Sequence, residues 1–105
     1  MVGYIFRAEN TVTKKTYIGK YYSVRFDKKY IGNDSGVLSD AEKYGRDKFI
    51  VNMIRACETV KDCDAGYELI LKELNAKSDE RYYNYEAPVE KEVIKKPRKK
   101  KVVDE

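Results

Sequence analysis

Apolar and polar positions alternate in two short stretches near the N-terminus, and this alternation predicts two β-strands. In the first stretch, residues 2–8, Tyr4 and Phe6 fall on one side of an extended chain and Ile5 falls on the other. The second stretch covers residues 16–22, and only a short polar segment separates the two. Strands so close in sequence are expected to pair as an antiparallel hairpin.

A compact apolar run at residues 48–56 predicts a third strand. Before it, residues 32–36 are rich in Gly, Asn, Asp and Ser, which is typical of a loop. A short helix is expected over residues 38–44, and Gly45 is then the residue that follows its C-terminus. This order places a helix between the hairpin and the third strand.

A second helix is predicted before residue 76, where apolar residues recur at the spacing i, i+3, i+4 and i+7. These residues are Tyr67, Ile70, Leu71 and Leu74. Either Asp62 or Asp64 is expected to cap the start of the helix. Together the elements predict an α+β fold with a small three-stranded, mostly antiparallel sheet flanked by two or three helices.

The composition changes near residue 76, beyond which aliphatic residues become scarce and charged residues frequent. We therefore expect a folded domain over residues 1–76 and a charged, flexible, basic C-terminal arm over residues 77–105. Six basic residues lie close together in this arm. They are Lys95, Lys96, Arg98, Lys99, Lys100 and Lys101.

The overall composition narrows the classes of function. The chain has 105 residues and a net charge of +4, from 22 basic and 18 acidic residues. No apolar run is long enough to cross a membrane, and no signal peptide is visible, so a cytoplasmic location and no membrane partner are expected. Histidine is absent, which excludes Ser-His-Asp and Cys-His nucleophile systems. Cys57 and Cys63 are expected to be reduced and partly buried.

The hairpin carries the first candidate chemistry. Phe6 and Tyr17 are expected to face each other across the two strands, and Gly19 would let a phosphate approach the backbone closely. Arg25 follows in a loop, and a guanidinium group beside phenol hydroxyls suits phosphate binding. The neighbouring tyrosines are Tyr21, Tyr22 and Tyr30. The alternative is that the aromatic rings form core and that Arg25 is simply solvated.

Several segments, taken in order and spacing, carry a resemblance to a known family. Tyr4-Ile5-Phe6 and Tyr17-Ile18-Gly19 resemble the paired motif that names the GIY-YIG nuclease superfamily. The later segments resemble the family's arginine-bearing segment, its helix with a Tyr-Gly turn and following strand, and the end of its next helix. They are residues 25–32, 41–49 and 71–75. The resemblance therefore spans roughly residues 2–75.

The resemblance implies a metal-dependent endonuclease of phage or homing-endonuclease type, which hydrolyses DNA phosphodiester bonds with Mg²⁺ or Mn²⁺. It implies that Tyr17 helps to activate the attacking water and that Arg25 stabilises charge on the phosphate. Tyr30 stands where many members of the family have histidine. Glu68 is the metal ligand that the resemblance implies.

Three features depart from the pattern of the family, and the first is the absence of the histidine that many members have. Phe6 stands where the first motif has a tyrosine hydroxyl, and matching the apolar helix face puts Tyr67 rather than Glu68 at the ligand position. One residue turns a side chain by about 100° around a helix. Asp27 or Asp34 could then approach the metal instead. The alternative function is a catalytically degenerate module that binds nucleic acid or a protein partner without cleavage.

DNA is the expected partner, and two sets of basic residues are expected to contact it. Lys20 follows the second motif directly, and the basic cluster of residues 95–101 lies in the predicted arm. Such cations bind phosphates without reading sequence, and their binding weakens steeply with salt. A solvated tail and, after it, a targeting signal are the alternatives for this cluster, and the many tyrosines also suit a protein interface.

Overall fold

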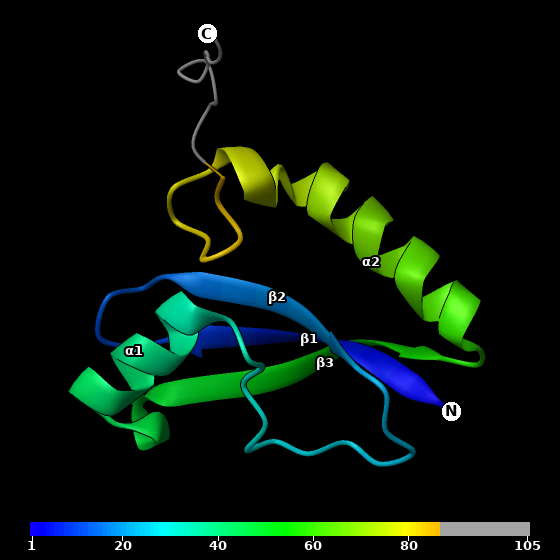
Figure 1. Ribbon diagram of the computed structural model, residues 1–105, viewed down its shortest axis with the longest axis horizontal. Helices are drawn as coiled ribbons and strands as arrows, with labels where there is room; N and C mark the ends of the chain where they lie inside the picture. Colours follow the sequence, from blue (N-terminus) through cyan, green and yellow to red (C-terminus); the bar gives the residue numbers. More distant parts are fainter. Residues whose placement is uncertain (87–105) are drawn as a thin grey trace, which may run out of the picture.

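A three-stranded sheet with the strand order β2-β1-β3 lies at the centre of the computed structural model, which describes residues 1–86 (Figure 1). Strand β1 covers Gly3–Asn10, β2 covers Thr16–Tyr21 and β3 covers Phe49–Cys57. Strand β1 pairs antiparallel with both neighbours, so the predicted hairpin and third strand are confirmed.

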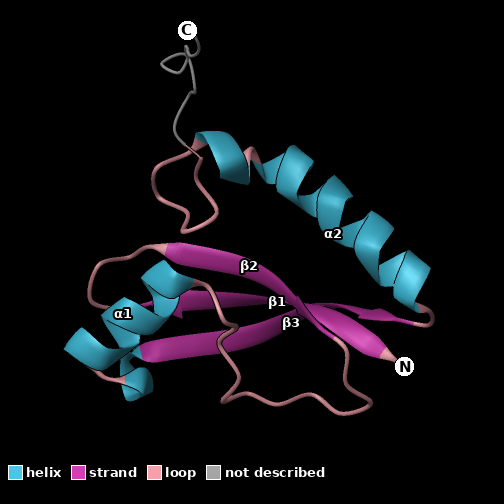
Figure 2. Ribbon diagram, viewed as in Figure 1, coloured by secondary structure: helices cyan, strands magenta, loops and turns pink. Residues whose placement is uncertain are grey.

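The helices are α1, Ser35–Tyr44, and α2, Val60–Leu74, with two short 3₁₀ helices, η1 at Arg46–Lys48 and η2 at Ala76–Ser78 (Figure 2). The predicted α+β class, a small antiparallel sheet flanked by helices, is confirmed. Helix α1 begins earlier than predicted because the Asp34 carboxylate accepts hydrogen bonds from the first backbone N–H groups of the helix, a cap that hydrophobic periodicity does not reveal.

The alternation of β1 divides the core into two layers, one on each face of the sheet. Tyr4 and Phe6 pack on the face that α1 covers, and Ile5 packs on the face that α2 covers. The first layer is completed by Ala8, Ile31, Val37, Ala41, Phe49 and Val51, and the second by Ile18, Cys57, Cys63, Leu71 and Ala76. Both cysteines are buried and free, as expected from the sequence.

Helix α2 differs from its prediction at both ends. Thr59 caps the helix by accepting a hydrogen bond from the backbone N–H of Asp62, so neither predicted aspartate is the cap. At the other end Leu74 is 41% exposed, although the periodicity placed it on the buried face. Cys63 and Gly66 are buried together with the predicted Leu71.

A segment that we call the C-terminal strap, residues 79–86, follows η2 and packs along the outer edge of β2. The backbone N–H of Thr16 donates to the Arg81 carbonyl, and the N–H of Tyr83 donates to the Thr16 carbonyl. The Asn84 side-chain amide both accepts from the N–H of Ile18 and donates to its carbonyl, each at 2.9 Å. The structured part therefore extends beyond the boundary predicted at residue 76, because backbone and amide hydrogen bonds hold a segment poor in aliphatic residues.

The described residues bear on two further predictions. Within residues 1–86, no helix is both long enough and apolar enough to cross a membrane. The basic cluster of residues 95–101 lies outside the described residues.

Candidate functional site

Tyr17 and Tyr30 come together around the ring of Phe6, on the face of the sheet that α1 covers. Phe6 is paired with Gly19 and Tyr17 with Ala8, so the two rings lie diagonally across the hairpin. The Phe6 ring makes edge contacts with Tyr17 at 6.0 Å and with Tyr30 at 5.7 Å between centroids. The predicted contact between Phe6 and Tyr17 is confirmed, and we call Phe6, Tyr17 and Tyr30 the tyrosine cluster.

Gly19 does not leave the opening that the sequence suggested for a phosphate. A Cβ atom at this position would lie 2.5 Å from the Phe6 ring and 2.6 Å from the Tyr17 ring. At Gly32, where φ is +94°, a Cβ atom would lie 2.7 Å from the Tyr17 ring. Both glycines therefore make room for aromatic side chains, and the predicted approach of a phosphate at Gly19 is wrong.

The Tyr17 phenol is held in its protonated form. Burial raises the pKa of Tyr17 above its ordinary value, and the nearby Tyr67, Asp34 and Tyr30 raise it further. Burial also raises the pKa of Tyr30, whose ring stacks on Tyr21 at 3.8 Å. A phenol with a raised pKa donates a hydrogen bond at neutral pH but is a poor acceptor of a proton from water.

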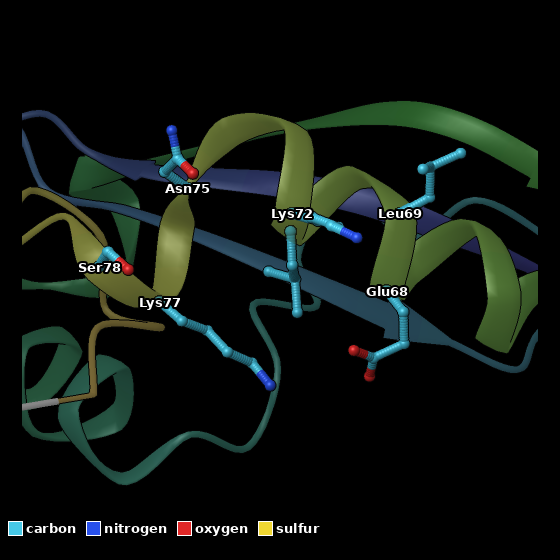
Figure 3. Close-up of a pocket in the computed structure, with 7 residues that line it drawn as sticks. Glu68, Leu69, Lys72, Asn75, Lys77 and Ser78 are labelled. Atoms are coloured by element: carbon cyan, nitrogen blue, oxygen red, sulfur yellow. The ribbon is translucent and has the colours of Figure 1, made fainter. Parts of the chain in front are cut away.

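Helix α2 presents Tyr67, not Glu68, to the sheet. Tyr67 is half-buried and packs against the α2-side core, where it helps to raise the pKa of Tyr17. Glu68 is exposed and lines a groove of about 510 Å³ between α2 and η2. Figure 3 shows Glu68 and Leu69 on the α2 side of this groove and Lys77 and Ser78 on the η2 side. The structure therefore corrects the expectation that Glu68 lies beside Tyr17.

The carboxylates of Asp34 and Asp64 already have hydrogen-bond partners. Asp34 is occupied as the cap of α1, and Asp64 accepts hydrogen bonds from Lys20 and Tyr22. Among residues 1–86, no group of three or more acidic or cysteine side chains lies close enough together to hold a metal ion. In proteins Mg²⁺ is usually held by one or two carboxylates together with waters and substrate phosphates, so the Mg²⁺ or Mn²⁺ that the resemblance implies stays a prediction.

Lys20 joins β2 to α2. Its ammonium group lies 2.8 Å from an oxygen of Asp64 and 4.9 Å from the centre of the Tyr67 ring. The hydrogen bond with Asp64 raises the pKa of Lys20 and lowers the pKa of the carboxyl group. The predicted contact of Lys20 with DNA would therefore compete with an ion pair that is already formed.

Arg25 lies in the long loop between β2 and α1 and lines a groove of about 540 Å³ to which Tyr17 does not contribute. Figure 1 shows this loop running below the strands, with α2 above them. The other residues that line the groove are Tyr21, Ser23, Phe26, Asp27, Lys28 and Lys29. Tyr21 is therefore the contact between the two regions, because it lines this groove and stacks on Tyr30 of the tyrosine cluster.

A second cavity of about 370 Å³ shares Lys28 and Lys29 with the first. Its other lining residues are Ile31, Arg46, Asp47 and Phe49. We call the two cavities together the basic groove, because four cations line it against two carboxylates. Within residues 1–86, none of these cations forms an ion pair, so their charges are free to meet an anion.

The buried side chain of Tyr4 fixes the loop that carries the basic groove. Tyr4 belongs to β1, and its hydroxyl reaches the loop and accepts a hydrogen bond from the backbone N–H of Asp27 at 3.0 Å. Around the same point, the Asp27 carboxylate accepts from the N–H of Lys29 and the Asp27 carbonyl accepts from the N–H of Tyr30. The Lys29 carbonyl accepts from the Arg46 guanidinium at 3.2 Å.

Sequence reasoning found Arg25 but missed the other cations of the basic groove. The pair Lys28-Lys29, three residues beyond Arg25, is a signal that was available in the sequence. Arg46 could not be found in this way, because it comes from η1 and reaches the groove only through the tertiary fold. Phe26 was read only as part of a motif, and its partly exposed position in the groove was missed.

Comparison of the chain with protein-family models, with curated proteins and with solved structures found no match. The likeness to GIY-YIG nucleases therefore remains a hypothesis that rests on the sequence segments between residues 2 and 75.

Proposed function

We propose that this chain is a cytoplasmic nucleic-acid-binding module with a GIY-YIG-like fold, which holds the phosphate backbone of DNA in the basic groove and does not cleave it. The observation that carries the proposal is the set of four cations that line two cavities sharing Lys28 and Lys29 and that form no ion pair within residues 1–86. Three of them come from the loop, Arg25, Lys28 and Lys29, and Arg46 comes from η1. Unpaired guanidinium and ammonium groups are the usual contacts of the phosphate backbone.

Three observations favour binding over cleavage. Tyr67 occupies the inward position on α2 at which the resemblance requires a metal-binding carboxylate. Tyr17 carries a raised pKa and so is a poor base. Finally, Arg25 lines the basic groove, whereas aromatic rings occupy the space next to Gly19 where a phosphate would have to approach Tyr17.

Phosphodiester cleavage is the second candidate, and the proximity of Tyr17 and Tyr30 favours it. Both hydroxyls belong to residues that contact the Phe6 ring, and the two influence each other electrostatically. A pair of protonated phenols can donate hydrogen bonds to phosphate oxygens and so stabilise developing charge.

One experiment separates the two candidates. The purified full chain is incubated with supercoiled plasmid in Mg²⁺ or in Mn²⁺, beside the variants Arg25→Ala and Tyr17→Phe, and both gel retardation and nicking are measured. We expect retardation without nicking, with retardation weakened by Arg25→Ala and unchanged by Tyr17→Phe. Nicking by the parent chain that Tyr17→Phe abolishes would overturn the proposal in favour of the nuclease.

A further inference from the structure

We propose that the basic groove binds single-stranded polynucleotide in preference to duplex, with one base stacked on the ring of Phe26. This inference deepens the proposed function and rests on it. It names the form of nucleic acid that the groove would select, and it assigns that selection to an aromatic side chain rather than to the cations.

The groove contains an aromatic surface as well as charge. Phe26 lines the groove between Arg25 and Lys28 and is 39% exposed. An exposed phenylalanine ring flanked by cations is the arrangement that single-strand-binding proteins use, because the ring stacks on a base while the cations contact the backbone on either side.

The Phe26 ring is held in place rather than loosely displayed. It packs edge-on against the buried ring of Tyr4, with centroids 5.3 Å apart. The Tyr4 hydroxyl binds the backbone N–H of Asp27, the residue that follows Phe26. An aromatic ring that already packs against a buried side chain, and whose neighbouring backbone is hydrogen-bonded, loses little conformational entropy when a base stacks on it.

Duplex DNA cannot use this ring in the same way. In a duplex both faces of every base are covered by neighbouring bases, so stacking on a protein side chain requires an unstacked base. The cations, by contrast, contact phosphates of either form. The cations of the groove would therefore contact both forms of nucleic acid, whereas the Phe26 ring would contact only the single strand.

The test uses the full chain and fluorescence anisotropy with labelled oligonucleotides of about twelve nucleotides, a length within the site sizes of known single-strand binders. The probes are oligothymidylate, oligouridylate and the thymidylate–adenylate duplex. The variants are Phe26→Ala, Phe26→Tyr and, as a control on a distant exposed cation of α2, Lys61→Ala.

We expect Phe26→Ala to weaken single-strand binding about tenfold, the usual effect of losing one stacked base, and to leave duplex binding nearly unchanged. Phe26→Tyr keeps a ring and should bind like the parent, which excludes a folding defect as the cause, and Lys61→Ala should have no effect. The deoxy and ribo single strands are both expected to bind, because the stacking contact does not involve the sugar.

The outcomes also separate this inference from the proposed function. The inference is overturned, and the proposed function left standing, if Phe26→Ala weakens single-strand and duplex binding equally. The same holds if the parent chain binds the duplex as tightly as the single strands, or more tightly. Failure of every oligonucleotide to bind the parent chain overturns both.

Discussion

The tyrosine cluster and the basic groove lie next to each other and share Tyr21 as a neighbour. They differ in how accessible their side chains are to solvent and to a ligand. In the tyrosine cluster, aromatic rings fill the space at Gly19 and Gly32, and burial raises the pKa of Tyr17. In the basic groove, Phe26 is partly exposed and the cations have no ion-pair partner within residues 1–86. Both regions contain aromatic rings, and within the described residues they differ in the burial of those rings and in the free cations that only the groove supplies.

This difference in accessibility follows from the elements that carry the two regions. Phe6 and Tyr17 of the tyrosine cluster lie on the two paired strands of the hairpin, whose register brings their rings into contact. The basic groove is lined mainly by the loop after β2, which is tied back to the sheet through the hydroxyl of Tyr4. Surface loops keep charged side chains in solvent, which is where phosphate contacts are made.

The largest effect is expected from reversing charge in the basic groove. The double variant Lys28→Glu/Lys29→Glu should lower affinity for DNA by about a hundredfold and reduce the salt dependence of binding by at least two phosphate contacts. The matched control, Lys61→Glu/Lys72→Glu on α2, changes the net charge equally and should have a much smaller effect. Anisotropy titrations at several salt concentrations measure both; equal losses in the two double variants would mean that net charge, not the groove, drives binding.

The next effect is on stability and concerns the C-terminal strap. Asn84→Ala removes two hydrogen bonds to the backbone of Ile18, which should lower the free energy of unfolding by about 2 kcal/mol. For a domain of this size the midpoint of thermal unfolding should fall by about 10 °C, while affinity for DNA stays close to that of the parent. A loss of DNA affinity at a temperature where the variant is folded would place the binding site at the edge of β2 instead.

A smaller effect tests how the two regions are joined. Tyr4→Phe keeps the buried ring but removes the acceptor for the N–H of Asp27, so hydrogen exchange at that amide should accelerate. The loss of about 1 kcal/mol of loop stabilisation should weaken DNA binding about threefold to fivefold. Unchanged exchange at Asp27 would show that the remaining loop contacts suffice to hold it.

The smallest effect is in the pH dependence of stability. Hydrogen bonds from Lys20 and Tyr22 lower the pKa of Asp64 below its ordinary value of 3.8 in the folded chain. The folded state therefore binds fewer protons than the unfolded state in this range, and the contribution is present above about pH 4 and is lost as the pH falls through the folded pKa. Asp64→Asn should show a smaller loss of stability between pH 7 and pH 3 than the parent, measured by denaturant unfolding; an equal loss would contradict the assignment.

The sequence predicted those parts of the fold that hydrophobic periodicity controls. Alternation around Tyr4 and Phe6 was sufficient for the hairpin, and Gly45 marked the end of α1. The predicted buried face of α2 was right at Leu71 but wrong at Leu74, because apolar periodicity identifies a helix face but not how much of it the rest of the protein covers. The C-terminal strap was missed because hydrogen bonds, rather than apolar side chains, hold it in place.

The candidate site was predicted less completely, because it depends on contacts between distant segments. The sequence grouped Tyr17, Tyr30 and Arg25, and the structure brings only the two tyrosines together. The register of α2 could be resolved only in three dimensions, where Tyr67 faces the core and Glu68 faces outward. The anchoring of the loop by Tyr4 has no signal in the sequence.

An NMR titration of the full chain with single-stranded oligonucleotide shows residue by residue whether nucleic acid binds in the basic groove. We expect the chemical shifts of backbone amides to change most at residues 25–29 and 46–47, which line the basic groove. We expect the amides of Tyr17, Ile18 and Tyr67 to stay nearly unchanged. Changes confined to these three residues, with the groove unaffected, would show that nucleic acid binds beside the tyrosine cluster and not in the groove.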